Sequence, residues 1–154
     1  MDLEVVLKIP RPPAEVRAWW LDAPADYRAS DPREQPHRIV TLRRDGRTWE
    51  TLTYWRVPPL RNLRIPETFT FREDGWDVDV RLPFGLAQRD VFTLAPTPTG
   101  TRVTIQVTVR PRNLVGRLAR PAFLRYARKS YPRAWRGAAK LCARDAPRLS
   151  PRSS

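Results

Sequence analysis

The side chains best able to do chemistry in this 154-residue chain are carboxylates, because it has a single histidine and a single cysteine. His37 and Cys142 lie far apart, and neither forms a zinc-ligand spacing with nearby acids. A nucleophile site would need His37 to find a distant partner, and a lone histidine near a strand start is more often structural. The six glycines form no phosphate-binding loop. We therefore predict neither a metal nor another cofactor.

Three aspartates are the candidate acids. Asp77 and Asp79 alternate with Trp76, Val78 and Val80, so they share the other face of a strand, where solvation is the ordinary role. Asp90 begins a strand beside Arg89 and could lie at a pocket mouth, paired with an arginine. Burial would have to raise its pKa before it could act as a general base. No catalytic residue follows from these patterns alone.

Aromatic side chains are the second group with a chemical use. They are more numerous than helix packing requires, and an apolar pocket with a few polar groups would use them. Filling the core is the alternative role for each of them. The candidate ligand-binding residues are Trp20, Tyr54, Phe71, Trp76, Phe92, Tyr131 and Trp135, with Asp90 as the polar candidate.

Positive charge is concentrated in the last third of the chain. Residues 110–154 hold 13 Arg or Lys against one acid, a net charge of +12, whereas residues 1–109 carry only +1. This asymmetry is typical of proteins with an anionic partner, RNA or a membrane, although arginine-rich solvated faces produce it too. The candidate basic surface comprises Arg125, Arg128, Lys129, Arg133, Arg136 and Lys140.

The elements that must position these side chains are a run of strands followed by one long helix. An apolar strand at residues 3–9 precedes a helix opened by Pro12 and Pro13. Asp45-Gly46 and Asp74-Gly75 predict hairpins, and the first would pair Leu42 with Trp49. Residues 58–66 contain three prolines and are predicted to form a loop. In the last strand, Val103, Ile105, Val107 and Val109 should face inward.

The last helix, about residues 114–145, is amphipathic. At about 100° per residue the basic residues separate from an apolar arc that includes Ala127, Tyr131 and Trp135. Pro121 suits a helix start, which would make 114–119 a separate turn, and Pro132 should kink the helix or restart it after Ser130. This order of elements indicates an α+β fold in which the helix covers a curved antiparallel sheet of about seven strands, with one or two short helices after the first strand.

The element order, the "GTRVTI" strand at Gly100–Ile105 and the amphipathic helix after "RPRN" resemble the START-like (SRPBCC) superfamily, which includes polyketide cyclase/dehydrase-like proteins and the birch-pollen-allergen fold. The resemblance covers about residues 2–145. It implies a single helix-grip domain over residues 1–145 with a polar tail at 146–154. It also implies an apolar cavity for a lipid-like or polyketide-like ligand.

Three functions compete on this basis. The first is an apolar-ligand binder or carrier, with cyclase or dehydratase activity left open and a non-enzymatic role favoured. The second is an RNA- or ribosome-associated module, although Tyr131 and Trp135 fall on the apolar arc and would be unavailable to stack on bases. The third is peripheral membrane lipid exchange through exposed Leu60, Leu63 and Ile65.

The chain lacks a signal-peptide pattern and an 18-residue apolar run, so we expect a cytoplasmic protein. The oligomeric state is not predicted.

Overall fold

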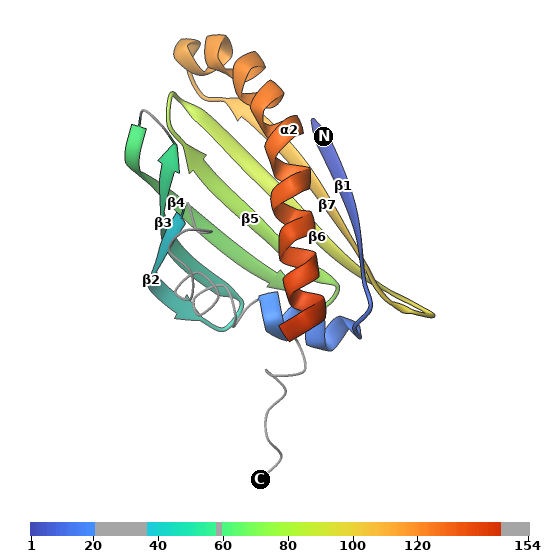
Figure 1. Cartoon of the computed structure of the whole chain (residues 1–154). Coiled ribbons are helices and arrows are strands. Elements are labelled where there is room, and N and C mark those ends of the chain that lie inside the picture. Colours follow the sequence, from blue (N-terminus) through green and yellow to red (C-terminus); the bar gives the residue numbers. More distant parts are fainter. Residues whose placement is uncertain (21–36, 58–59, 146–154) are drawn as a thin grey trace.

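A computed structural model describes the backbone of residues 1–20, 37–57 and 60–145, and all of their side chains except those of 37–41, 54–57, 60–62 and 145. Seven antiparallel strands form one sheet in the order β1-β7-β6-β5-β4-β3-β2, and α2 lies across one face (Figure 1). The elements are β1 (Leu3–Ile9), β2 (His37–Asp45), β3 (Thr48–Val57), β4 (Leu60–Arg72), β5 (Gly75–Leu82), β6 (Leu86–Thr97), β7 (Gly100–Pro111) and α2 (Leu114–Asp145). The predicted helix-grip architecture is confirmed.

Strict alternation along the strands gives the sheet an apolar concave face. In β7 the four predicted inward residues are all buried, and β1 buries Val5, Leu7 and Ile9 against them. α2 packs chiefly on β1 and β7, with less contact to β6. A short helix that includes residues 13–20 lies at one end of the sheet and contributes Val16 and Trp19 to the core. The segment 21–36, in which a second short helix or a loop was expected, lies outside the described residues.

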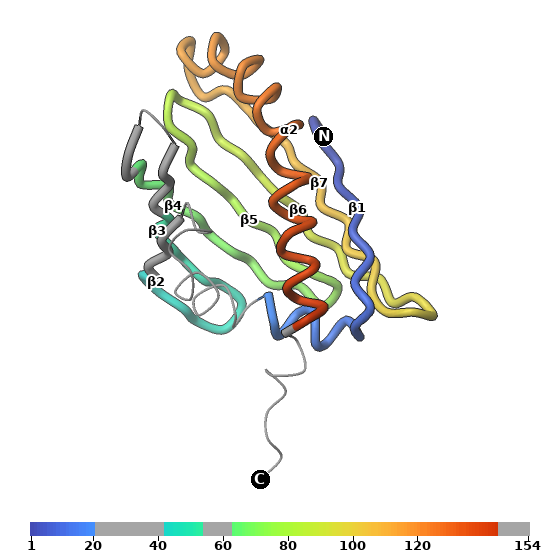
Figure 2. Tube along the Cα trace, in the orientation of Figure 1, coloured from blue at the N-terminus to red at the C-terminus, as the bar shows by residue number. Residues whose placement is uncertain are grey.

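α2 is one helix that bends, rather than a turn followed by a new helix. It includes both Pro121 and Pro132, so the separate turn predicted at 114–119 is wrong, and of the two alternatives at Pro132 the restart after Ser130 is excluded. The tube in Figure 2 shows its first turns running along the end of the sheet before the helix changes direction. The guanidinium of Arg120 donates to the Val109 carbonyl at 2.9 Å and is paired with Asp2. The tertiary contacts of Arg120 therefore hold the first turns and the sheet together beside Pro121, which cannot donate a helical hydrogen bond.

Two local predictions from turn residues fail. The first hairpin turns at Gly46-Arg47, with Asp45 opposite Thr48 and Arg44 opposite Trp49, and a bulge displaces Leu42 from the ladder. The predicted Leu42–Trp49 pair is therefore absent. Residues 60–66 belong to β4, with Pro66 opposite Leu52. Proline is tolerated there because β4 pairs with β5 only from Glu67 onward, so Pro66 has an unpaired side.

Within the described residues, no helix is both long enough and apolar enough to cross a bilayer. Residues 146–154, predicted to be a polar tail, lie outside the described part of the chain.

Candidate functional site

A cavity of about 560 Å³ lies between the concave face of the sheet and one flank of α2. Strands β3 to β6 form its floor, the 13–20 helix contributes two tryptophans, and α2 forms a wall. Most of its lining side chains are apolar or aromatic. The polar and charged side chains that line it are Thr53, Glu67, Gln88, Asp90, Ser130 and Arg133.

The strand register explains why polar groups enter this otherwise apolar face. Phe71, Trp76 and Phe92 form one row across β4, β5 and β6. The next row places Asp90 beside Val78, and the row after it carries Glu67, Val80 and Gln88. Successive rows sit two residues apart along each strand, so all of these side chains share the concave face. An aromatic row is therefore followed by two rows that bring carboxyl and amide groups to the cavity.

Asp90 lies at one end of a buried chain of hydrogen bonds. The Gln88 Nε2 amide donates to both carboxyl oxygens of Asp90 at 2.9 Å. The Tyr131 hydroxyl on α2 donates to Gln88 Oε1 at 2.8 Å. Tyr131 thus fixes the orientation of the Gln88 amide, and that amide in turn holds the carboxyl. No arginine pairs with Asp90 among the described side-chain contacts: Asp90 lies inside β6 rather than at its start, and Arg89 points to the other face of the sheet, where it pairs with Asp77.

Burial sets the protonation state of Asp90 and Tyr131, the two titratable groups linked through Gln88. Burial raises the pKa of Asp90 to about 7, and the negative charges of Glu67 and Asp79 add to the shift, while the Gln88 hydrogen bond opposes it. Burial, reinforced by Asp90, also raises the pKa of Tyr131 above its usual value, so the phenol keeps its proton. Near neutral pH the cavity therefore holds a carboxyl poised between its two forms beside a phenol that stays neutral.

Aromatic rings form a continuous array beside this chain. Trp76 and Phe92 stack with centroids 4.9 Å apart, and Trp20 lies 5.7 Å from Trp76. Trp135 meets Phe92 edge-on at 6.0 Å and contacts Tyr131 at 5.1 Å. The array therefore runs from the 13–20 helix over the sheet to α2. Rings in these arrangements add attraction beyond the area that they bury.

The predicted ligand-binding residues fall into three groups in the structure. Trp20, Phe92, Tyr131 and Trp135 line the cavity, as does Asp90. Phe71 and Trp76 are buried in the core, and Trp76 supports the lining from behind through its contacts with Trp20 and Phe92. Tyr54 lies in β3 opposite Arg64, and its side chain is outside the described residues. Whether any of these side chains binds a ligand stays a prediction.

Sequence reasoning missed Gln88 and Glu67. The signal for Gln88 was available, because Leu86, Gln88, Asp90, Phe92 and Leu94 alternate along β6 and are all buried. Two polar residues on a strand face that is otherwise apolar indicate a site more specifically than Asp90 alone. Glu67 also carried a signal, because it alternates with Phe69 and Phe71 and therefore shares their face of the strand.

The apolar arc of α2 divides into a buried half and a cavity flank. Leu124, Ala127 and Cys142 are buried against the sheet. On the cavity flank, Ala134 and Arg133 are exposed and line the cavity, although Arg133 was expected on the outer basic face. The other predicted basic residues (Arg125, Arg128, Lys129, Arg136 and Lys140) are exposed as expected. Tyr126 is 45% exposed among them, so the basic face does include a ring.

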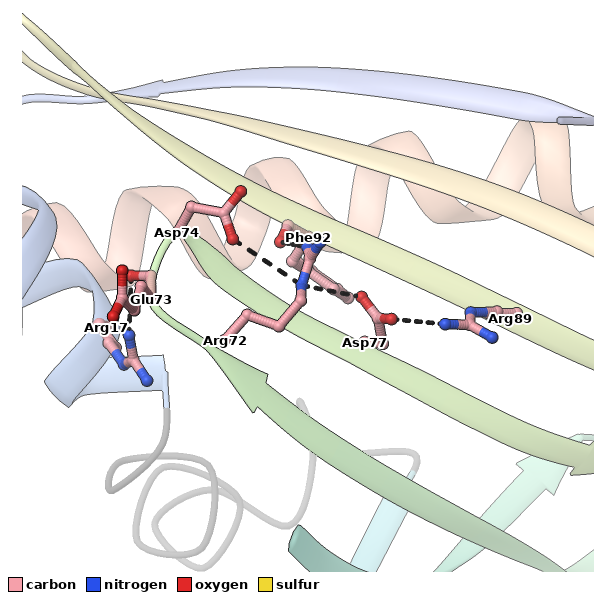
Figure 3. Close-up of polar contacts among 7 residues, drawn as sticks. All are labelled: Arg17, Arg72, Glu73, Asp74, Asp77, Arg89 and Phe92. Atoms are coloured by element: carbon pink, nitrogen blue, oxygen red, sulfur yellow. Dashed lines mark hydrogen bonds and ion pairs between the residues drawn. The ribbon is translucent and has the colours of Figure 1, made fainter. Parts of the chain in front are cut away.

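The acids on the outer face of the sheet differ from each other. Asp79 is exposed, as predicted for a solvated strand face. Asp77 is buried, because Arg89 donates to it at 2.6 Å and Arg72 lies 3.3 Å from its other oxygen (Figure 3). The full solvation predicted for Asp77 is wrong, since two arginines from neighbouring strands cover it. This cluster faces away from the cavity and stabilises the sheet behind it.

The comparisons with known proteins rest on structure, since no protein-family model and no curated protein sequence matches the chain. The crystal structure of Ara h 8.0201 superposes with a TM-score of 0.63 at 14% identity, covering 95% of this chain and 97% of that one. The chain has the START-like helix-grip fold. The di-domain ARO/CYC StfQ from the steffimycin biosynthetic pathway has the same TM-score at 17% identity, covering 96% of this chain and 48% of StfQ.

A third structure of similar fold spans nearly the whole chain. TTHA0849 from Thermus thermophilus superposes with a TM-score of 0.62 at 16% identity, covering 99% of this chain and all of that one. At these identities the likeness extends to the fold and not to individual side chains.

Proposed function

We propose that this START-like chain binds an apolar small molecule, lipid-like or polyketide-like, in the cavity between the sheet and α2. The observation that carries the proposal is the Asp90–Gln88–Tyr131 chain set among aromatic side chains in a cavity of about 560 Å³. Small-molecule sites have this composition: a mostly apolar surface with a few convergent polar groups. The volume also lies within the range of about 300–1,000 Å³ that is usual for such sites.

The polar chain defines what the ligand should carry. A ring or acyl body would pack on Trp20, Phe92 and Trp135, whose faces border the cavity. A hydroxyl or carbonyl would sit at Asp90, which can accept a hydrogen bond when ionised and donate one when protonated. We therefore expect a flat or chain-like apolar molecule with at least one oxygen, and weaker binding of hydrocarbons that lack it.

Asp90 also supports a second candidate, cyclase or dehydratase chemistry on the same ligand. Its ionised carboxylate could take the proton from a carbon next to a ligand carbonyl, so that the C–H electrons form a carbon–carbon double bond. The hydroxyl on the next carbon then leaves as water with a proton returned from the Asp90 carboxyl. The observation in favour is the buried carboxyl with a pKa of about 7, near the optimum for a group that both accepts and returns a proton.

Gly137 offers a direct test of the cavity. It lines the cavity from within α2, and a Cβ built on it meets no atom within 4 Å. Gly137→Leu should extend into cavity space, and leucine is a better helix former than glycine, by somewhat less than the roughly 0.8–1 kcal/mol that separates alanine from glycine. Gly137→Ala is the matched control, because it gains helix propensity but adds little volume.

The readout is the fluorescence of 1-anilinonaphthalene-8-sulfonate, together with native mass spectrometry of protein purified from its own host. We expect Gly137→Leu to weaken probe binding at least about tenfold and to lose any co-purifying apolar ligand, while Gly137→Ala binds like wild type. Equal probe binding by the leucine variant, with thermal unfolding showing an intact fold, would place the probe outside the cavity and refute the proposal.

The enzymatic candidate needs its own measurement. A ligand recovered from the host protein would be incubated with fresh protein and followed by mass spectrometry for loss of one water. Asp90→Asn should still bind the ligand and should stop this conversion. Conversion at the wild-type rate by the asparagine variant would exclude Asp90 as the acid and base.

A further inference from the structure

Four large apolar side chains are exposed together at one end of the sheet. They are Phe84 in the β5–β6 turn and, in the first turns of α2, Leu114, Val115 and Leu118, with exposed fractions of 56%, 70%, 55% and 78%. We call these four residues the tip. Single exposed apolar residues are ordinary on protein surfaces, whereas a cluster of them marks an interaction site.

The two segments of the tip are fixed to each other. The Arg112 amide donates to the Gly85 carbonyl at 2.7 Å, and Asn113 caps α2 by accepting from the Gly116 amide at 2.8 Å. Gly116 lies so close to the turn that a Cβ there would come within 2.2 Å of the Gly85 oxygen. The tip is therefore a defined surface that the fold holds in place.

Phe84 adds a second, independent observation. Its φ is +61°, a conformation that costs a bulky L-residue energy and that glycine or asparagine adopts more easily. The turn thus has a strained backbone at a residue whose side chain is largely in water. Neither the backbone nor core packing explains a phenylalanine there, and strain of this kind is found at functional positions.

The exposed charged residues that flank the tip in the sequence are all positive. Arg81, Arg110, Arg112 and Arg117 are exposed beside it, and residues 110–144 contain no acid. The outward side of α2 also changes along its length. It is apolar at Leu114, Val115, Leu118 and Ala122, and from Arg125 onward it carries Lys129, Arg136 and Lys140, all of them exposed. An apolar end surrounded by arginines matches the boundary between acyl chains and anionic headgroups.

We propose that the tip is a peripheral membrane-contact site, at which Phe84, Leu114, Val115 and Leu118 enter the surface of an anionic bilayer while the surrounding arginines bind its headgroups. The site differs from the one expected from Leu60, Leu63 and Ile65. Ile65 is fully buried and Leu63 packs against the core, so neither supplies an exposed apolar side chain, and the side chain of Leu60 lies outside the described residues. The proposal does not depend on the identity of the cavity ligand.

Vesicle co-sedimentation tests it on the full chain. Wild type would be mixed with phosphatidylcholine vesicles, with and without phosphatidylglycerol, at low and high salt. The test variant is Leu114→Asp/Leu118→Asp. The matched control is Val6→Asp/Leu42→Asp, which makes the same change of charge at two exposed apolar residues (49% and 61%) away from the tip. Leu42 lies near the β2–β3 turn, at the opposite end of the sheet from the β5–β6 turn.

We expect wild type to sediment with the anionic vesicles and to be released by salt. The tip variant should bind these vesicles at least about tenfold more weakly than wild type, and the control should bind within about twofold of wild type. Equal binding by the tip variant and the control, or no wild-type binding at low salt, would overturn the proposal. So would concentration-dependent self-association that only the tip variant loses, because the tip would then contact a second copy.

Discussion

The cavity and the tip depart from the usual distribution of side chains in opposite directions. In the cavity, a carboxyl is buried among aromatic rings without a cationic partner in the described side-chain contacts, and its pKa rises to about 7. At the tip, four large apolar side chains stand in water, one of them on a strained backbone. Asp77 on the outer face of the sheet follows the ordinary rule, because this buried carboxylate is covered by two arginines.

This contrast separates side chains that stabilise the fold from side chains that do not. Proteins keep locally unfavourable arrangements mainly where a function uses them. Replacing the groups at the two sites should therefore affect stability in different ways. Removing an aromatic ring that borders the cavity should be costly, whereas removing the buried charge or the exposed apolar side chains of the tip should cost little or improve stability.

The largest effect is expected for Phe92→Ala. Phe92 contacts Trp20, Trp76 and Trp135, so its removal leaves a void at the centre of the aromatic array. The free energy of unfolding should fall by about 3–5 kcal/mol, measured by urea denaturation. A loss below about 1 kcal/mol would mean that the array is loosely packed and that the cavity wall is not part of the core.

A pH-dependent effect is expected for Asp90→Asn. The Asp90 carboxyl titrates near 3.8 in the unfolded chain and near 7 in the folded protein, so the folded state holds its proton more tightly. Its contribution to the unfolding free energy is complete below about pH 4, declines as pH rises, and is lost above about pH 7. The asparagine variant lacks this decline, and above pH 7 it should be more stable than wild type by up to about 4 kcal/mol.

Urea denaturation at a series of pH values measures this difference. Gln88→Glu is not a suitable control because it adds charge, and Asp79→Asn is unsuitable because Asp79 contributes to the shift of the Asp90 pKa. The exposed Glu50→Gln removes one charge from the outer face of the sheet and should leave the pH profile nearly parallel to wild type. Parallel profiles for wild type and Asp90→Asn would show that the carboxyl is solvated.

A smaller gain is expected for Phe84→Asn. Asparagine adopts positive φ more readily than phenylalanine, so the free energy of unfolding of the variant should be about 1 kcal/mol higher than that of wild type. Phe84→Leu keeps the strain and should show no gain. Thermal unfolding of the two variants gives the comparison, and destabilisation by asparagine would mean that the Phe84 ring contributes packing energy.

The smallest effect is expected for Leu118→Gln. Leu118 is the most exposed residue of the tip, and the two residue types have similar helix propensities. The free energy of unfolding should change by less than about 0.5 kcal/mol, measured by urea denaturation beside Phe92→Ala. A larger loss would place Leu118 in a contact that stabilises the monomer.

Much of the fold could be predicted because strand and helix periodicity are local. Alternation placed Val103, Ile105 and Val107 on the buried face, and the helical wheel separated Tyr131 and Trp135 from most of the basic residues. Turn residues were less reliable. Asp45-Gly46 predicted a hairpin but not its register, because the chain turns at Gly46-Arg47 and a bulge displaces Leu42 from the ladder. The prolines in residues 58–66 would exclude a strand only if β4 had a paired strand on both sides along its whole length. It pairs with β5 only from Glu67 onward.

The candidate site was less predictable, because it depends on contacts between distant segments. Asp90 was found as a carboxyl of interest, but its partner is Gln88 two residues away, and the group that orients Gln88 is Tyr131 on α2. No local pattern reports such a contact. The tip was missed for the same reason, since Phe84 and Leu114 become neighbours only when α2 begins against the β5–β6 turn.

By itself the sequence determined the class of fold, the inward faces of the strands and the two sides of the last helix. It also determined that positive charge is concentrated in the last third of the chain. These follow from repeats of two and 3.6 residues and from composition, which need no long-range information. Only the tertiary structure decided which apolar residues are buried and which stay in water. Burial depends on what the rest of the chain covers: the sheet covers Ala127 and Cys142, and the described part of the chain leaves Leu114 and Leu118 exposed.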